Sequence, residues 1–184
     1  LDVVGHRIPN YFVDRDSLNN KDELTNIGLL ARDMADDEAL IIFPEGTRFS
    51  TEKLGKAIAA LSETAPTRVK SASELRSVLP PRTAGTLAAL AESNADIVIC
   101  NHVGISDISS LQQLRAAVPL QTELKFKLWR TPRSEVNQTQ FVQWLDAQWA
   151  IVDDWVTNNE DVTSPLSKPA SLNANETATT IEKE

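Results

Sequence analysis

The first third of the chain alternates between short apolar runs and an amphipathic segment. Residues 11–15 (YFVDR) are strand-like and end on a polar pair. Residues 17–38 then repeat apolar side chains at helical spacing, and Asp22 and Glu23 suit the positive N-terminal end of a helix. The continuous apolar run ALIIF at 39–43 is typical of a buried strand. This order predicts a βαβ unit, and therefore a parallel sheet with a right-handed crossover.

The middle of the chain predicts further helices and strands. Residues 50–63 (STEKLGKAIAALSE) favour a helix, and Ser71 with Glu74 matches a capping box for another. Residues 78–86 (VLPPRTAGT) indicate a loop. Residues 88–100 (AALAESNADIVIC) predict a helix followed by a buried strand, and residues 122–130 (TELKFKLWR) alternate as in a half-exposed edge strand.

Residues 135–156 carry the strongest helix pattern in the chain. One stripe of that helix is apolar, consisting of Phe141, Trp144, Leu145, Trp149 and Val152. We expect the tryptophans to pack in the core, because Asp146, Asp153 and Asp154 on the same helix disfavour docking to anionic lipid. From residue 157 the chain is polar and predicts a disordered tail. The fold class predicted is an α/β domain over residues 1–156, with a mostly parallel or mixed sheet flanked by helices, and a tail over 157–184.

Composition narrows the classes of function. A formal net charge of −8 argues against general nucleic-acid binding, which depends on clustered Lys and Arg, but it allows a local basic site for one phosphate. Cys100 is the single cysteine, so no internal disulfide forms, and we expect it to be a small buried apolar residue. No apolar run approaches the roughly 18 residues of a membrane span.

The candidate chemistry follows the run at 39–43. Pro44 ends a strand because it has no N–H to donate, and Gly46 allows a sharp turn or a close backbone approach to a ligand. Thr47 can donate a hydrogen bond to an anion, and Arg48 offers a planar fork suited to phosphate. Glu45 would repel phosphate, which leaves it to accept from a hydroxyl or to orient Arg48. The same residues also fit an ordinary turn with a surface ion pair between Glu45 and Arg48.

The block FPEGTR at 43–48 resembles the signature of the glycerolipid acyltransferases, which include the 1-acylglycerol-3-phosphate acyltransferases. Residues 5–17 (GHRIPNYFVDRDS) are similar to the family block that precedes it. Residues 78–86 resemble the proline-containing block that follows, and residues 123–132 (ELKFKLWRTP) resemble a late strand of the family.

This resemblance implies a fold and an activity. The family transfers a fatty acyl group from coenzyme A or acyl carrier protein to a hydroxyl of a (lyso)glycerophosphate, with the thioester as co-substrate and no other cofactor or metal. Glu45, Gly46, Thr47 and Arg48 would hold the acceptor, with Arg15 and Arg82 as further phosphate contacts. The expected partners are the acceptor, the acyl donor and a membrane surface, with the protein at the cytoplasmic face of a membrane and no nucleic acid involved.

The family's catalytic base is a His followed five positions later by an Asp, in a block that precedes Gly5. Only four residues precede Gly5, so the resemblance implies that this block lies upstream of Leu1. The segment NHVGISD supplies the same spacing with His102 and Asp107, but after FPEGTR. Three hypotheses therefore stay open: an acyltransferase portion carrying the acceptor site, a rewired enzyme using His102 and Asp107, and a catalytically inactive lipid-phosphate binding or regulatory module.

Overall fold

The computed structural model describes residues 20–104, 111–116, 118 and 123–160. Within these residues helices predominate, and two strands form a small sheet. The main elements in order are α2 (Asn20–Arg32), α3 (Thr51–Thr64), α4 (Val69–Ser73), α5 (Thr83–Glu92), β1 (Ile97–Val103), α6 (Leu111–Ala116), β2 (Lys125–Thr131) and α7 (Phe141–Glu160). Three 3₁₀ turns cover Pro66–Arg68, Arg133–Glu135 and Gln138–Gln140.

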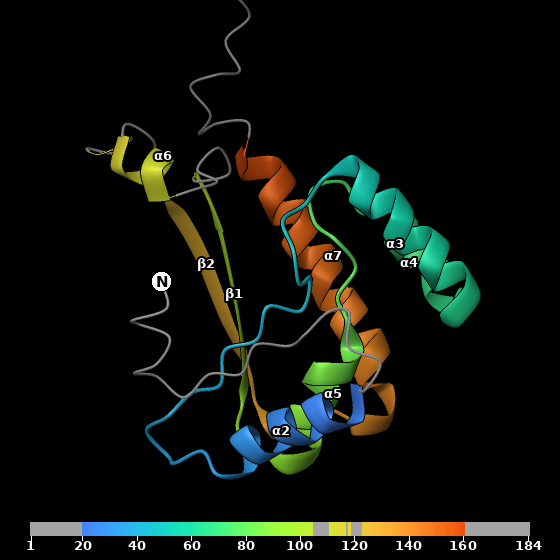
Figure 1. The fold of residues 1–184 in the computed structure, drawn as a ribbon, viewed down its shortest axis with the longest axis vertical. Coiled ribbons are helices and arrows are strands. Elements are labelled where there is room, and N and C mark those ends of the chain that lie inside the picture. Colours follow the sequence, from blue (N-terminus) through green and yellow to red (C-terminus); the bar gives the residue numbers. More distant parts are fainter. Residues whose placement is uncertain (1–19, 105–110, 117, 119–122, 161–184) are drawn as a thin grey trace, which may run out of the picture.

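Helix α7 is the centre of the arrangement. It lies between the sheet on one side and α3 with α4 on the other, while α2 and α5 pack together at one end of the molecule (Figure 1). The apolar stripe predicted for residues 135–156 is confirmed, because Phe141, Leu145, Trp149 and Val152 are buried and Trp144 packs against them. Helix α7 continues to Glu160, beyond the expected domain boundary after residue 156.

The helices predicted at 17–38 and 50–63 are confirmed as α2 and α3. Ser50 caps α3 by accepting from the backbone N–H of Lys53 at 3.3 Å, and no residue of α3 is fully buried. The capping box predicted from Ser71 and Glu74 is wrong. Ser71 lies inside α4 and its hydroxyl donates to the carbonyl of Arg68, so it competes for a preceding backbone acceptor instead of capping a helix that follows.

Strands β1 and β2 pair antiparallel, with Ile97 opposite Thr131 and Val103 opposite Lys125. Alternation was predicted for β2, but which of its faces meets the core was not. The strand ending at Cys100 was predicted to be buried, whereas β1 alternates between buried and exposed side chains. Ile99 and Val103 of β1 face α7 and are buried, whereas the outer face carries the exposed side chains of Val98, Phe126 and Leu128. Cys100 shares this outer face and is exposed, so its predicted burial is wrong, because the strand's alternation gives the inner side to its neighbours.

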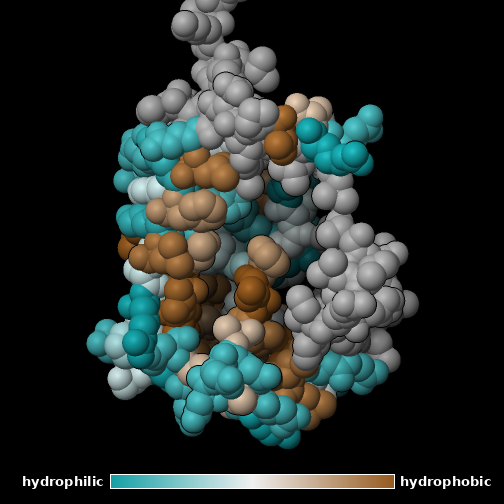
Figure 2. All heavy atoms as spheres, turned by 90° about the vertical axis from the view of Figure 1, so that its left-hand side faces the viewer, coloured by the Kyte–Doolittle hydropathy of each residue, from teal (hydrophilic) through white to brown (hydrophobic). Residues whose placement is uncertain are grey.

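The outer face of the sheet belongs to a larger area of apolar surface on this side of the molecule (Figure 2). In a half-buried antiparallel strand the exposed face is usually the polar one. Here Lys127 of β2 faces α7, and its ammonium group lies 5.4 Å from the ring centroid of Trp129. Lys127 thus shares the covered side of β2 with Trp129, and the apolar side chains of Phe126 and Leu128 occupy the open side.

The predicted buried strand at 39–43 is wrong. These residues form neither a helix nor a strand, and Ile41 and Phe43 are 76% and 82% exposed. An apolar run is buried as a strand only where neighbouring strands pair with it, and the sheet of the described residues holds β1 and β2 alone. The strand expected at 11–15 lies outside the described residues. Helices and a sheet occur together as predicted, but the sheet that the structure describes is antiparallel.

The buried core joins α7 to the inner face of β1 and to the segment that follows α4. Its aliphatic and aromatic members lie after residue 74, in the segment that follows α4, in α5, in β1, and in α7 with the turn before it. They are Leu75, Val78, Leu90, Ile99, Val103, Val136, Phe141, Leu145, Trp149, Val152 and Val156. Because Leu75 and Val78 belong to this core, the irregular segment after α4 is anchored to α7, and this segment leads directly to the candidate site.

Candidate functional site

The segment from Pro44 to Arg48 forms a tight turn ahead of α3. The backbone N–H of Gly46 donates to the carbonyl of Phe43 at 3.0 Å, and Gly46 has a φ of +68°, in the left-handed region that favours glycine. The backbone N–H of Arg82 donates to the carbonyl of Pro44 at 2.9 Å. A β-carbon at residue 46 would lie 3.6 Å from Nε of Arg82, so the arginine side chain passes directly over the glycine.

Lys53 joins the other half of this turn to α3. Its ammonium group donates to Oγ1 of Thr47 at 2.9 Å and to the carbonyl of Arg48 at 3.0 Å. Both acceptors are neutral, so they leave its positive charge uncompensated. Among the residues that the structure describes, Arg48, Lys53 and Arg82 form no ion pair. Three cationic residues therefore lie in or beside this turn, and none of them pairs with Glu45, the acid of the turn.

Glu45 points into the protein. Its Oε2 accepts from the backbone N–H of Leu79 at 2.9 Å, which ties the turn to the segment after α4. Burial raises the pKa of the Glu45 carboxyl, and the charge of Asp153 raises it further, while the N–H groups of Leu79 and Trp149 act in the opposite direction. The indole N–H of Trp149 lies near this carboxyl without completing a hydrogen bond. The surface ion pair between Glu45 and Arg48, one reading of the sequence, is not formed.

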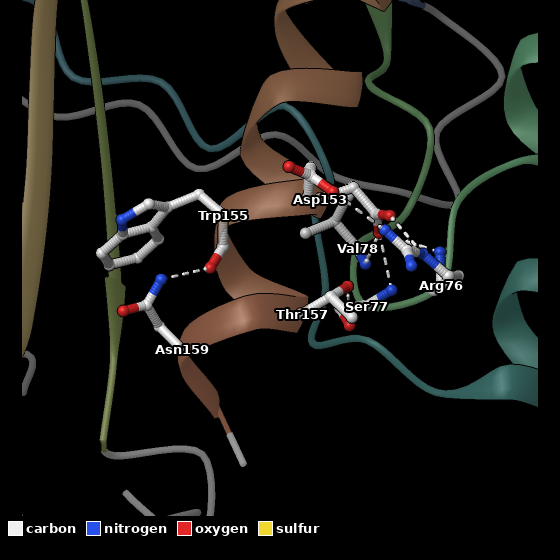
Figure 3. A network of polar contacts seen from close by, with 8 residues as sticks. Arg76, Ser77, Val78, Asp153, Trp155, Thr157 and Asn159 are labelled. Carbon is white, nitrogen blue, oxygen red and sulfur yellow. Dashed lines mark hydrogen bonds and ion pairs between the residues drawn. The ribbon is translucent and has the colours of Figure 1, made fainter. Parts of the chain in front are cut away.

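Two aspartates of α7 hold the segment that carries Arg82. Asp146 pairs with Arg68 at 2.6 Å, and the same guanidinium donates to the carbonyl of Pro81 at 2.9 Å. Asp153 accepts backbone hydrogen bonds one helical turn beyond Trp149, as Figure 3 shows from close by. Sequence reasoning did not assign these roles to Arg68, Asp146 or Asp153. A usable signal was present, because both aspartates lie at helical spacing from the apolar stripe.

The sequence-predicted site residues are only partly brought together. Glu45, Gly46, Thr47, Arg48 and Arg82 meet in one turn, as the preceding contacts show. Arg15 and Asp107 lie outside the described residues. His102 is on the outer face of β1, exposed, with its ring 6.0 Å from that of Phe126.

The position of His102 differs from that of the turn. Glu45 lies near Trp149 and Asp153 of α7, and α7 covers the inner face of the sheet. His102 projects from the outer face. His102 is the one histidine among the described residues, since His6 lies outside them. The described part of the chain therefore places no imidazole beside the turn.

Two surface hollows lie away from this turn. A groove of about 520 Å³ runs between β2 and the C-terminal half of α7, with Lys127 and Trp155 in its lining, and another of about 280 Å³ lies between α2 and α5. Neither hollow includes a residue of the turn. Among the described residues no cluster of His, Cys, Asp or Glu has the arrangement of a metal site. The exposed side chains of Arg48 and Arg82 give the turn a cationic surface.

Comparison with known proteins adds no assignment: no family model, no curated protein and no solved structure matches the chain. In the part of the chain that the structure describes, every helix is too short or too polar to cross a bilayer.

Proposed function

We propose that the turn at 44–48, with Lys53 and Arg82, binds the phosphate of an acyl acceptor. The chain would then provide the acceptor side of an acyltransferase that moves a fatty acyl group from coenzyme A or acyl carrier protein to a (lyso)glycerophosphate. The observation that carries this proposal is the charge arrangement. Arg48, Lys53 and Arg82 form no ion pair within the described residues, while Glu45 turns inward to the N–H of Leu79.

Each cation has a distinct part in binding. Arg48 is exposed and free to approach a phosphate oxygen, and its planar fork allows two parallel hydrogen bonds. Arg82 lies across Gly46, where the absence of a side chain lets the guanidinium pack close to the turn and present its N–H groups to a phosphate. Lys53 fixes Thr47 and the carbonyl of Arg48, and so holds the turn while adding positive charge.

Exposed apolar residues beside the turn support an acceptor that carries a hydrocarbon chain. Ile41 and Phe43 lie within three residues before Pro44 and are largely exposed. A phosphate held at Arg48 would place the rest of an amphiphilic acceptor near these side chains, where burial of apolar area favours binding. This arrangement also supports action at a membrane surface, where such an acceptor resides, and we propose the cytoplasmic face as the location.

In the reaction, the acceptor hydroxyl oxygen attacks the thioester carbonyl carbon. A C–O bond forms, the C–S bond breaks, and the hydroxyl proton passes by way of a base to the departing thiolate. The residues of the turn bind and orient the acceptor, and they do not supply the base. The resemblance places that base in a block upstream of Gly5.

The second candidate is a catalytically inactive lipid-phosphate binding module. The position of His102 favours it, because this histidine lies on the outer face of the sheet and α7 lies on the inner face. Both candidates predict phosphate binding, and they differ in acyl transfer. Incubation with acyl-CoA and a lysophosphatidate distinguishes them: binding without turnover by the protein with its native N-terminus supports the inactive module.

Binding is tested by calorimetry with glycerol 3-phosphate and with lysophosphatidate. Arg48→Ala and Arg82→Ala should each weaken binding by about tenfold or more, since a hydrogen bond to a charged group contributes roughly 1.5–3 kcal/mol. Lys56→Ala is the matched control, because Lys56 lies on the same helix as Lys53 but pairs with Glu52 at 2.6 Å. Affinities unchanged in both arginine variants would contradict the phosphate assignment.

A further inference from the structure

Four consecutive backbone N–H groups after α4 are all taken by carboxylates. Arg76, Ser77 and Val78 donate to one oxygen of Asp153 at 2.8, 2.7 and 3.2 Å, and Leu79 donates to Glu45 at 2.9 Å. Figure 3 shows the Asp153 side chain reaching from α7 toward this segment. Successive N–H groups that point the same way form a concavity suited to an anion, and here the protein's own carboxylates occupy it.

Asp153 is the more deeply buried of the two carboxylates that hold this segment. It is 3% exposed and belongs to the face of α7 that packs on the core, so its carboxylate is held by its surroundings. Its neighbour Asp154 is exposed and contacts only the guanidinium of Arg76, at 3.3 Å. The two aspartates are adjacent in sequence but differ in what they hold: Asp153 fixes the backbone, and Asp154 touches the end of one side chain.

The fixed backbone leads within three residues to Arg82. Pro80 and Pro81 lie between Leu79 and Arg82, and proline restricts φ, so little freedom separates the attached segment from the arginine. Arg68 holds the carbonyl of Pro81, and the N–H of Arg82 bonds to the carbonyl of Pro44. A shift of residues 76–79 is therefore passed on to Arg82 instead of being absorbed by a flexible linker.

We propose that Asp153 is a positioning residue for the phosphate site, holding residues 76–78 so that the guanidinium of Arg82 lies across Gly46. This inference rests on the proposed function for its effect on binding, and on the hydrogen bonds above for its effect on geometry. Asp153 does not touch the ligand. It acts through Arg82 and not through Arg48, which belongs to the turn on the other side of Gly46.

Because Asp153 acts through Arg82, its effect on binding can be distinguished from a general loss of stability. In the full 184-residue chain, Asp153→Ala should weaken glycerol 3-phosphate binding by about tenfold, close to the effect of Arg82→Ala. Combined with Arg82→Ala it should weaken binding little further, because the arginine it positions is gone. Combined with Arg48→Ala it should multiply the losses.

Two variants control for folding and for charge. Asp153→Asn keeps an oxygen that can accept the three N–H groups, so it should retain most of the affinity, and it keeps the test usable if Asp153→Ala does not fold. Asp154→Ala removes an adjacent carboxylate and should leave binding unchanged. An equal loss of affinity on adding Asp153→Ala to the wild type and to Arg82→Ala would overturn the positioning role.

A ligand-free measurement separates this inference from the proposed function. Hydrogen exchange at the backbone N–H of Arg82 reports its bond to Pro44 directly. Faster exchange in Asp153→Ala, with normal exchange in Asp154→Ala and Asp153→Asn, supports the positioning role even if Arg48→Ala and Arg82→Ala bind like the wild type and the phosphate assignment fails. Unchanged exchange in Asp153→Ala overturns the positioning role, whatever the affinities are.

Discussion

The ion pair between Arg68 and Asp146 makes a quantitative prediction about stability. Nε and Nη2 of the arginine donate to the two carboxylate oxygens at 2.8 and 2.6 Å, which is a bidentate arrangement. The two side chains are only 12% and 13% exposed. The arginine also donates to the carbonyl of Pro81 at 2.9 Å, so one guanidinium connects α7 to the segment that carries Arg82.

Asp146→Ala would leave this arginine buried with a single neutral acceptor. Removing one partner of a buried ion pair typically costs about 3–5 kcal/mol, and we expect about 3 because both side chains keep some contact with water. For a chain of this size that loss lowers the melting temperature by about 6–12 °C. Urea titration followed by tryptophan fluorescence gives the free energy, and calorimetry gives the melting temperature.

A control variant and a double variant test whether the loss of stability in Asp146→Ala comes from the broken ion pair. Asp154→Ala removes an exposed carboxylate of the same helix, and it should change the free energy of unfolding by no more than about 0.5 kcal/mol. The double variant Arg68→Met with Asp146→Leu should be more stable than the sum of the two single losses allows, since an apolar pair leaves no uncompensated charge. A loss below about 1 kcal/mol for Asp146→Ala is the value of a surface pair and would refute the reasoning.

Two further predictions concern the turn. Gly46→Ala should destabilise the protein by about 1–2 kcal/mol, the cost of a β-carbon at positive φ, and it should weaken phosphate binding. The control is Gly55→Ala in α3, where a β-carbon meets nothing within 4 Å and should stabilise the protein by up to about 1 kcal/mol. Equal changes in the free energy of unfolding of the two variants, measured by urea titration, would contradict backbone strain at residue 46. The raised pKa of Glu45 means that the folded state holds its proton more tightly than the unfolded state, so stability is fullest below the ordinary glutamate pKa and falls as pH rises through the folded pKa. Glu45→Gln should remove that fall in a series of urea titrations across pH, and an unchanged pH profile would show that Glu45 does not cause it.

Local patterns predicted the helices well and the sheet less well. Spacing alone gave α2, α3 and α7, because each helix satisfies its backbone within its own segment. The run at 39–43 has the composition of a buried strand, but a strand needs a partner elsewhere in the chain, and Phe43 is instead exposed. Likewise β2 alternates as expected, yet alternation does not specify which face meets α7, and Leu128 faces outward. Long-range pairing decides both questions.

The candidate site shows the same limit from the side of chemistry. The motif gave the members of the turn, and the loop predicted at 78–86, whose second half is the start of α5, gave Arg82, but nothing local linked the two. Their connection runs through α7, whose aspartates were interpreted from the sequence only as charges that disfavour docking to anionic lipid. Asp146, Trp149 and Asp153 are spaced at i, i+3 and i+7, which places them on one face of a helix.

That face is the buried one, and the spacing therefore carries information that a count of charges does not. An aspartate on the buried stripe of a helix needs hydrogen-bond donors, because an unpaired buried carboxylate is costly. Asp146 finds a guanidinium and Asp153 finds three backbone N–H groups, all from residues 68–78. A loop with free N–H groups and no strand or helix of its own is the natural source of such donors. Acids on the apolar stripe of α7 thus predict that an irregular segment docks there, and in this protein that segment carries Arg82 to the turn.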